Sequence, residues 1–380
     1  MALITTSVSF AIRAQLETVF ISDFHLSSQD LGTAFAPVFL GLTITLIIGG
    51  ALVDLFGIKR ISWLAFFAHL TGITMTMLAF DFWSLFFGSL AIGFGNGLVE
   101  AGCNPLVATI YKDKKIQMLN RFHIWFPGGI VLGSIFGYFI VEKLALPWQV
   151  LVASMYIPTL IFGVLIYGQQ FPKTERVQLG ISNKSMWKAV VTPLFIFMGF
   201  CMILTASTEL GTNQRISALL EKTGVSAILV LAFINGIMAI GRSFAGPVVK
   251  KLGSTGMLLF SAIFATIGLL WLSYSNGTST FLAAGVFAVG VCFFWPTMLG
   301  FVSEKIPESG ALGLSVIGGI GNFAASISLP IIGIFMDMES SGASTLRYMS
   351  VMPLILIVAF GFLFLNLRKP AVPAFETKQT

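Results

Sequence analysis

The chain has 380 residues, of which 56% are hydrophobic and only 10% are charged, and its mean hydropathy is +0.92. This composition excludes a soluble globular protein, because too few polar side chains are available to cover a water-facing surface. The formal net charge is +6, and the three cysteines are isolated from one another, which indicates neither a disulfide framework nor a metal site.

Twelve apolar stretches follow one another along the chain, and each is long enough to cross a bilayer. A membrane-spanning helix needs about 20 apolar residues, whereas a strand of a membrane β-barrel needs only about 10. The expected helices cover residues 2–22, 31–53, 61–80, 83–110, 119–141, 148–168, 190–215, 225–249, 256–274, 279–302, 311–336 and 348–367. We therefore expect an all-α polytopic membrane protein with twelve transmembrane helices.

The 2–22 stretch is expected to be a retained helix rather than a signal peptide. It has no basic N-terminal segment and no Ala-x-Ala cleavage site, and Arg13 and Glu17 interrupt its apolar run. A charge inside the bilayer is costly, so such residues usually face a cavity or a partner. The spacing of four residues leaves two interpretations: an ion pair within the helix, or an arginine that contacts an anionic or hydroxyl-rich solute.

The 83–110 helix carries a narrow polar face. Asn96, Glu100 and Asn104 follow one another at intervals of four residues, and the rest of the helix is apolar and rich in glycine. This pattern predicts one wall of a polar cavity, or alternatively a protonated carboxyl group that is hydrogen-bonded between helices. Desolvation favours the neutral form of a carboxyl group and a nearby cation favours the charged form, which suits a proton carrier.

The 190–215 helix has a similar polar stripe, which includes Glu209 and Asn213. We favour solute contact over simple hydrogen bonding between helices for this stripe, and Glu209 is a second candidate for proton coupling. Weaker candidates in later helices are Asn235, Trp295 and Asn322. The full set of candidate solute-binding residues is Arg13, Glu17, Asn96, Glu100, Asn104, Glu209, Asn213, Asn235, Trp295 and Asn322.

The longest polar connector, residues 169–189, divides the chain into two sets of six helices. An internal repeat supports this division, because residues 50–57 and 246–253 both read Gly-x-x-Val-charged-x-x-Gly. Such a duplication is typical of secondary transporters, whose binding site lies between the two halves. The expected parts are an N-terminal bundle (1–168), a cytoplasmic connector (169–189), a C-terminal bundle (190–367) and a cytoplasmic tail (368–380).

Basic residues are distributed unevenly between the two sides of the membrane. The loops after every second helix, together with the C-terminal tail, carry sixteen lysines and arginines, and the opposite loops carry three. The positive-inside rule therefore predicts that both termini are cytoplasmic, in an inner (plasma) membrane of the bacterial type. The net positive charge arises from this bias, so we expect a lipid bilayer and no nucleic acid as a partner.

The first copy of the repeat extends into a longer motif. Residues 50–60 read Gly-x-Leu-Val-Asp-x-Phe-Gly-x-Lys-Arg, which resembles the signature of the major facilitator superfamily between its second and third helices. The resemblance implies two six-helix bundles that alternate in access, with gating roles for Asp54, Lys59 and Arg60. Arg242 lies one turn inside the predicted inner surface and is assigned to gating or to snorkelling.

A second resemblance narrows the family. The run Leu-Val-Glu-Ala-Gly-Cys-Asn-Pro at 98–105, and Leu-Asn-Arg-Phe-His at 119–123, are similar to the fucose–galactose–glucose proton symporter branch. In the sugar permeases of that branch this glutamate takes part in sugar and proton handling, which implies the same role for Glu100. Those permeases also carry an aspartate in the first helix. Here Arg13 occupies the comparable region, which leaves sugar specificity open.

These observations predict a secondary active transporter for a small polar solute, with a sugar as one option and a proton as the coupling ion. The main alternative is a proton-coupled exporter of drugs or amphipathic solutes. Such exporters usually carry Gly-Pro-x-x-Gly-Gly late in the fifth helix, where this chain has Ser-Ile-Phe-Gly-Tyr at 134–138. A membrane-embedded enzyme or sensor is a distant alternative, because no nucleophile, base or metal-ligand set converges. We expect no cofactor and no metal, and a monomer.

Overall fold

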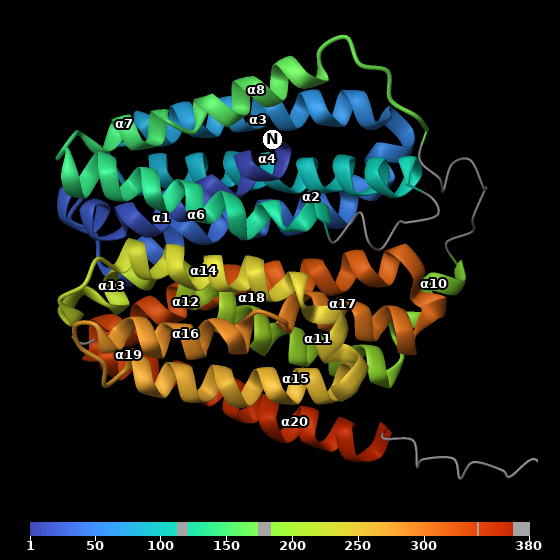
Figure 1. Cartoon of the computed structure of the whole chain (residues 1–380). Coiled ribbons are helices and arrows are strands. Elements are labelled where there is room, and N and C mark those ends of the chain that lie inside the picture. The colour runs from blue at the N-terminus through green and yellow to red at the C-terminus, as the bar shows by residue number, and fades with distance from the viewer. Residues whose placement is uncertain (112–120, 174–183, 340–341, 368–380) are drawn as a thin grey trace, which may run out of the picture.

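The computed structural model describes residues 1–111, 121–173, 184–339 and 342–367. Two helical bundles lie side by side, the first in blue to green and the second in yellow-green to red (Figure 1). The first bundle contains α1 (Ala2–Asp23), α2 (Ser28–Phe56), α3 (Ile58–Met77), α4 (Phe82–Ile110), α6 (Trp125–Gly137), the π-helix η2 (Tyr138–Lys143), α7 (Trp148–Ala153) and α8 (Tyr156–Ile166).

The second half of the chain follows the connector, of which residues 174–183 lie outside the described residues. Its elements are α10 (Lys184–Ala189), α11 (Pro193–Ala206), the π-helix η3 (Ser207–Gly211), α12 (Thr212–Gln214), α13 (Ile216–Leu219), η4 (Glu221–Thr223), α14 (Ala227–Ser243), α15 (Ala245–Leu272), α16 (Ser279–Val291), α17 (Phe294–Lys305), η5 (Pro307–Ser309), α18 (Gly310–Glu339), α19 (Gly342–Met349) and α20 (Val351–Leu367).

The prediction of twelve helical crossings is confirmed. In the described part of the chain, nine helical segments are long and apolar enough to span a membrane, and α14 is a shorter apolar helix. The helices α1 and α3, which carry charged residues, complete the set. Several crossings consist of consecutive pieces, such as α6 with η2, α7 with α8, and α11 with η3, α12 and α13.

The predicted break between the helices at 225–249 and 256–274 is present. The element α15 runs from Ala245 to Leu272, but it consists of two helices that meet at a kink at Gly253, where φ is 68°. Glycine has no Cβ and therefore adopts this left-handed conformation at little cost. Gly57, with φ of 82°, ends α2 in the corresponding place of the first bundle, so the glycines of the repeat provide the two turns.

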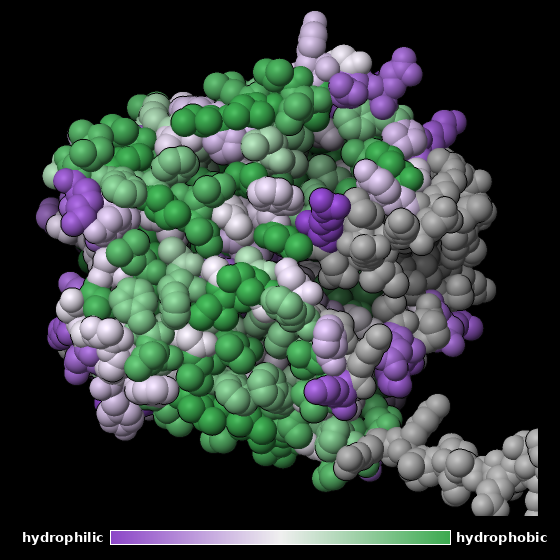
Figure 2. Space-filling view, in the orientation of Figure 1, coloured by the Kyte–Doolittle hydropathy of each residue, from purple (hydrophilic) through white to green (hydrophobic). Residues whose placement is uncertain are grey.

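We call the end of the molecule that contains residues 24–27, 144–147 and 273–278 the outer end, after the side that the charge bias predicts; it lies at the left in Figure 1. The opposite end, where α8 and α20 finish, is the inner end. In Figure 2 hydrophobic side chains cover the flanks of both bundles, and hydrophilic ones gather toward the two ends. This distribution fits a protein that is surrounded by lipid.

Two long seams join the bundles. One is formed by α2 and α18, and the other by α6 and α14. Glycines permit the first seam to close: a Cβ on Gly32 would lie 2.5 Å from the backbone oxygen of Leu329, and one on Gly333 would lie 2.5 Å from that of Ser28. Small residues at a helix–helix contact let the backbones approach closely, which is the usual means of packing inside membranes.

Candidate functional site

Charged residues in the interior of the helices define the candidate site, and most of them are paired. Glu17 of α1 forms an ion pair with Arg215, with 2.7 Å between Oε1 and Nη1, and both side chains are 0% exposed. The backbone N–H of Ala218 donates a hydrogen bond to the second oxygen of Glu17 at 3.3 Å. Because α1 and α13 belong to different bundles, this pair ties the two halves together.

This pairing overturns one interpretation of the sequence. An ion pair within α1, between Arg13 and Glu17, was one of two alternatives, and it is wrong because Glu17 contacts Arg215 instead. Arg215 was not among the candidate residues. Its partner lies about 200 positions away in the chain, so no helical spacing could have connected them. The available signal was only that an arginine sits near the outer end of a hydrophobic stretch.

Further hydrogen bonds between the bundles cluster around this pair, toward the outer end. Arg215 Nη2 donates to the backbone oxygen of Ser28 at 2.8 Å, and the Ser217 hydroxyl donates to the backbone oxygen of Ala14. Asp337 of α18 accepts from the N–H groups of Ser28 (3.0 Å) and Gln29 (2.9 Å), at the first turn of α2. The outer ends of the two bundles are therefore closed against each other.

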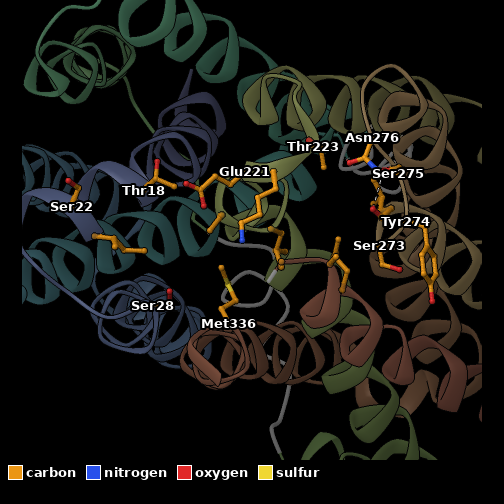
Figure 3. Close-up of a pocket in the computed structure, with 18 residues that line it drawn as sticks. Thr18, Ser22, Ser28, Glu221, Thr223, Ser273, Tyr274, Ser275, Asn276 and Met336 are labelled. Atoms are coloured by element: carbon orange, nitrogen blue, oxygen red, sulfur yellow. Dashed lines mark hydrogen bonds between the residues drawn. The ribbon is translucent and has the colours of Figure 1, made fainter. Parts of the chain in front are cut away.

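A cavity of about 700 Å³ lies on the outer side of this closure (Figure 3). Thr18 and Ser28 line it from the first bundle, and Glu221, Asn276 and Met336 line it from the second. We call this cavity the outer vestibule. The Glu17–Arg215 pair separates this vestibule from the polar residues farther inside.

Arg13 lies one turn inward of Glu17 and is 4% exposed. Its Nε donates to Gln214 Oε1 of the second bundle at 3.3 Å, and its Nη1 donates to Ser9 Oγ at 3.4 Å. The Phe10 ring lies 4.9 Å from its Cζ, which is a favourable cation–π distance. Its Nη2 is buried without a hydrogen-bond partner among the described residues.

The three polar residues of α4 do not act as one face. Asn96 is 0% exposed and its Oδ1 lies 2.9 Å from His69 Nε2 of α3, so it stabilises packing inside the first bundle. Asn104 contacts His123, with 3.2 Å between Oδ1 and Nε2. Glu100 is partly exposed, and no hydrogen bond or ion pair joins its carboxylate to another described residue.

Glu209 lies in η3 and is paired within the second bundle. Arg242 Nη2 of α14 lies 3.3 Å from Glu209 Oε1, and Arg242 Nε donates to the backbone oxygen of Cys292 at 3.1 Å. The other oxygen of Glu209 is buried without a partner in the described part of the chain. A π-helical segment widens the helix locally and is frequent at functional sites. The sequence had placed Arg242 at the gate, and its contact with Glu209 was not predicted.

The remaining candidates are placed as follows. Asn213 is buried, and its Oδ1 has no hydrogen-bond partner in the described part of the chain; it precedes Gln214, which contacts Arg13. Asn235 and Asn322 donate to carbonyl groups of their own helices, which is a structural use of both amides.

The Trp295 ring packs against α18 at Gly321, where an added Cβ would lie only 2.8 Å from the ring. Lys59 and Arg60 are exposed at the start of α3. The side chain of Asp54 lies outside the described part of the structure, so its gating role stays a prediction. Within the described ranges no group of three or more His, Cys, Asp or Glu side chains is arranged to hold a metal ion.

Comparison with known proteins agrees with this architecture. The family described as the Major Facilitator Superfamily matches residues 1–329. The chain belongs to this superfamily. The resemblance read from residues 50–60 is thereby confirmed, and transport rather than catalysis is the function of the fold.

Several curated relatives are transporters. An uncharacterized MFS-type transporter of Mycobacterium tuberculosis is 24% identical over 51% of this chain, which spans about half of that relative's length (47%). The quinolone resistance protein NorA of Staphylococcus aureus is 22% identical, with 84% of each chain covered. The hexuronate transporter of Bacillus subtilis is 25% identical, with 80% of this chain and 77% of the relative covered.

Solved structures share the fold. The xylose transporter XylE of Escherichia coli, in a partially occluded inward-open conformation, superposes with a TM-score of 0.78 at 15% identity and covers 97% of this chain and 95% of its own. The Escherichia coli fucose:proton symporter FucP gives a TM-score of 0.64 at 16% identity, with 95% and 97% covered.

Proposed function

We propose that this transporter moves a small polar solute together with protons, and that the structure represents a state that is closed at the outer end. Members of the superfamily expose a central site to one side of the membrane at a time. The ion pair of Glu17 with Arg215, and the contacts of Asp337 with the first turn of α2, support closure on one side. The candidate residues Arg13, Glu100 and Glu209 lie inward of that closure.

The observation that carries the proton-coupling proposal is the isolation of Glu100. Each of the other two glutamates in the interior of the helices has an arginine partner, whereas Glu100 has none among the described residues. A carboxyl group in the membrane that lacks a permanent cation is stable as the neutral acid, and it loses its proton where water reaches it. Glu100 is partly exposed here, so water can reach its carboxyl group, and the proposal requires that the opposite state of the cycle buries it.

The solute class is supported by polarity rather than by a named ligand. Arg13 and Gln214 form a buried hydrogen-bonded pair between the bundles, and the buried Asn213 precedes Gln214 in the chain; these polar groups suit a hydroxyl-rich or charged solute. A second candidate function is export of drugs, because NorA matches 84% of the chain. The two functions differ in their ligands. Thermal stabilisation of the purified protein by sugars, organic acids or quinolones therefore separates them.

The test of coupling uses a solute found in that panel. In proteoliposomes, Glu100→Gln should abolish accumulation driven by a pH gradient and retain exchange of solute, because glutamine keeps the shape but cannot ionise. Glu209→Gln is the matched comparison from the second bundle. Accumulation by Glu100→Gln under a pH gradient would disprove the assignment, and a selective failure of Glu209→Gln would move the role there.

Orientation is tested separately. In a background without native cysteines, a cysteine at His25 should react with an impermeant thiol reagent in intact cells, and one at Gln169 should not; both positions are exposed. The uneven distribution of basic residues motivates this expectation. Reversed labelling would contradict the topology in which both termini are cytoplasmic.

A further inference from the structure

The buried arginine of α1 is held in place by its neighbours, and one of its nitrogens has no hydrogen-bond partner among the described residues. Gln214 fixes Arg13 from the second bundle: its Oε1 accepts from Arg13 Nε at 3.3 Å, and its own amide donates to the Phe10 backbone oxygen at 3.1 Å. The Phe10 ring supports the guanidinium and is itself held edge-on by Phe39 and Phe126. The remaining nitrogen, Nη2, makes no hydrogen bond to any described residue.

Arg13 also differs from the two comparable arginines in having no carboxylate beside it among the described residues. Arg215 and Arg242 each have a glutamate within 3.3 Å, whereas the described residues offer Arg13 only the neutral oxygens of Ser9 and Gln214. A buried cation without an anion is costly, and the cost is offset when a negative group binds beside it. A guanidinium is well suited to a carboxylate, because its planar nitrogens match the two oxygens.

The position of Arg13 agrees with a ligand site. It lies one turn inward of Glu17, so the Glu17–Arg215 closure separates it from the outer vestibule of Figure 3. Its contact with Gln214 places it between the bundles, where a bound molecule meets both halves. Two further buried oxygens nearby in sequence have no partner in the described structure: Thr6 Oγ1, on the same face of α1, and Asn213 Oδ1, beside Gln214.

We infer that the transported solute carries a single carboxylate, which pairs with the Nη2 edge of Arg13. The hydroxyl groups of the solute then bind to neutral oxygens and amides nearby. One unpaired cation favours one negative charge over the two of a phosphate monoester. This inference rests on the proposed function and adds the substrate class: an acidic solute of the size of a sugar acid, rather than a neutral sugar or a cationic drug.

The experiment compares acids with their neutral counterparts. Thermal unfolding of the purified full chain is measured with D-galacturonate against D-galactose, D-glucuronate against D-glucose, and D-gluconate against D-sorbitol, with glucose 6-phosphate as the dianion. At least one monocarboxylate should stabilise the wild-type protein, and its neutral counterpart and the phosphate should not. In Arg13→Gln the apparent affinity for that acid should fall by about 10-fold to 100-fold, as expected for loss of a charged hydrogen bond.

Two further variants keep the test decisive. Arg13→Lys retains the charge and should recover part of the affinity, which shows that Arg13→Gln fails through charge and not through misfolding. Arg347→Gln makes the same chemical change at an exposed position of the outer end and should bind the acid like the wild type. The inference is overturned if a neutral member or the phosphate binds as tightly as its acid, if Arg13→Gln keeps the affinity, or if no carboxylate stabilises the wild type.

The outcomes are separable from those of the proposed function, because binding is measured without a membrane gradient. A neutral solute that accumulates with protons through Glu100 would leave the proposed function standing and remove this inference. An acid that binds through Arg13 but accumulates independently of the pH gradient would support this inference and contradict proton coupling.

Discussion

Two pairs of glutamate and arginine, one between the bundles and one inside the second bundle, differ in how completely they are sealed. The Glu17–Arg215 pair is 2.7 Å long and both side chains are 0% exposed. The Glu209–Arg242 pair is 3.3 Å long, with 16% of the Arg242 side chain and 6% of the Glu209 side chain exposed. The first pair must break when the bundles separate at the outer end, whereas the second can persist because both partners move together.

The same kind of ion pair therefore has different consequences between the bundles and within one bundle. A buried ion pair contributes little to stability relative to apolar residues, but removing one partner is strongly destabilising, because the other charge remains buried and uncompensated. Between the bundles, we expect Glu17–Arg215 to act as a latch, which is intact when the outer end is closed and is broken and hydrated when that end opens. Within one bundle, Glu209–Arg242 is a local contact between η3 and α14.

The largest effect is expected for the latch. Glu17→Gln should lower the free energy of unfolding by about 3–5 kcal/mol, because it leaves Arg215 buried without an anion. The replacement of both residues, Glu17→Leu with Arg215→Met, should recover much of that loss. Thermal unfolding of both single variants and the double variant gives the coupling energy. Additive losses, without recovery in the double variant, would show that the pair is not a unit.

The latch also predicts a change in accessibility. A cysteine at Ala14, which is 0% exposed and contacts Ser217 across the bundle interface, should label slowly from outside in the closed state. Glu17→Gln should accelerate this labelling several-fold, since the outer end opens more often. Unchanged labelling would mean that the other contacts at the outer end keep the bundles closed without the ion pair.

A smaller effect is expected for the pair inside the second bundle. Glu209→Gln should lower the free energy of unfolding by about 1.5–3 kcal/mol, the range for a hydrogen bond to a charged group. It should not change the labelling of a cysteine at Ala14, because Arg242 and Glu209 do not join the bundles. Accelerated labelling in Glu209→Gln would break the distinction between a latch and a local contact.

The α2–α18 seam offers a test without charges. Gly333→Ala should destabilise the closed outer end, at a cost of about 1–3 kcal/mol for overpacking, since the added Cβ would lie 2.5 Å from the backbone oxygen of Ser28. Gly361→Ala in α20 is the matched control, because a Cβ there meets nothing within 4 Å. Equal unfolding temperatures for the two variants would indicate that the seam is not tightly packed.

The smallest effect on stability is expected for Asp81, an acid at the outer end whose hydrogen bonds are made within the first bundle. Asp81 caps α4, and hydrogen bonds from the Ser84 hydroxyl (2.6 Å) and N–H (2.8 Å) hold its pKa below the usual 3.8. A lowered folded pKa contributes stability above the usual value, and that contribution is lost as the pH falls through the folded pKa. The unfolding temperature of Asp81→Asn should thus be slightly below that of the wild type at pH 7, and the difference should vanish once the pH falls below the lowered pKa of Asp81. A difference that persists there would contradict this assignment.

The sequence was sufficient for the fold because the bilayer imposes a simple rule. Every backbone polar group in lipid must be satisfied within its own segment, so apolar stretches of about 20 residues read directly as helices. The glycine-containing repeat at 50–57 and 246–253 indicated the duplicated plan, and its glycines do make the two turns. The fifth and seventh crossings contain π-helical segments that no pattern in the sequence had predicted.

Residue types inside the membrane were also visible from the sequence: Arg13, Glu17, Glu100 and Glu209 stand out because charge is costly there. Their partners were decided only by tertiary structure. Glu17 binds an arginine from the other half of the chain rather than the arginine one turn away on its own helix. Helical spacing determines which residues share a face, but the packing of one bundle against the other determines which face meets which, and that packing left Arg13 without an acidic partner in the described structure.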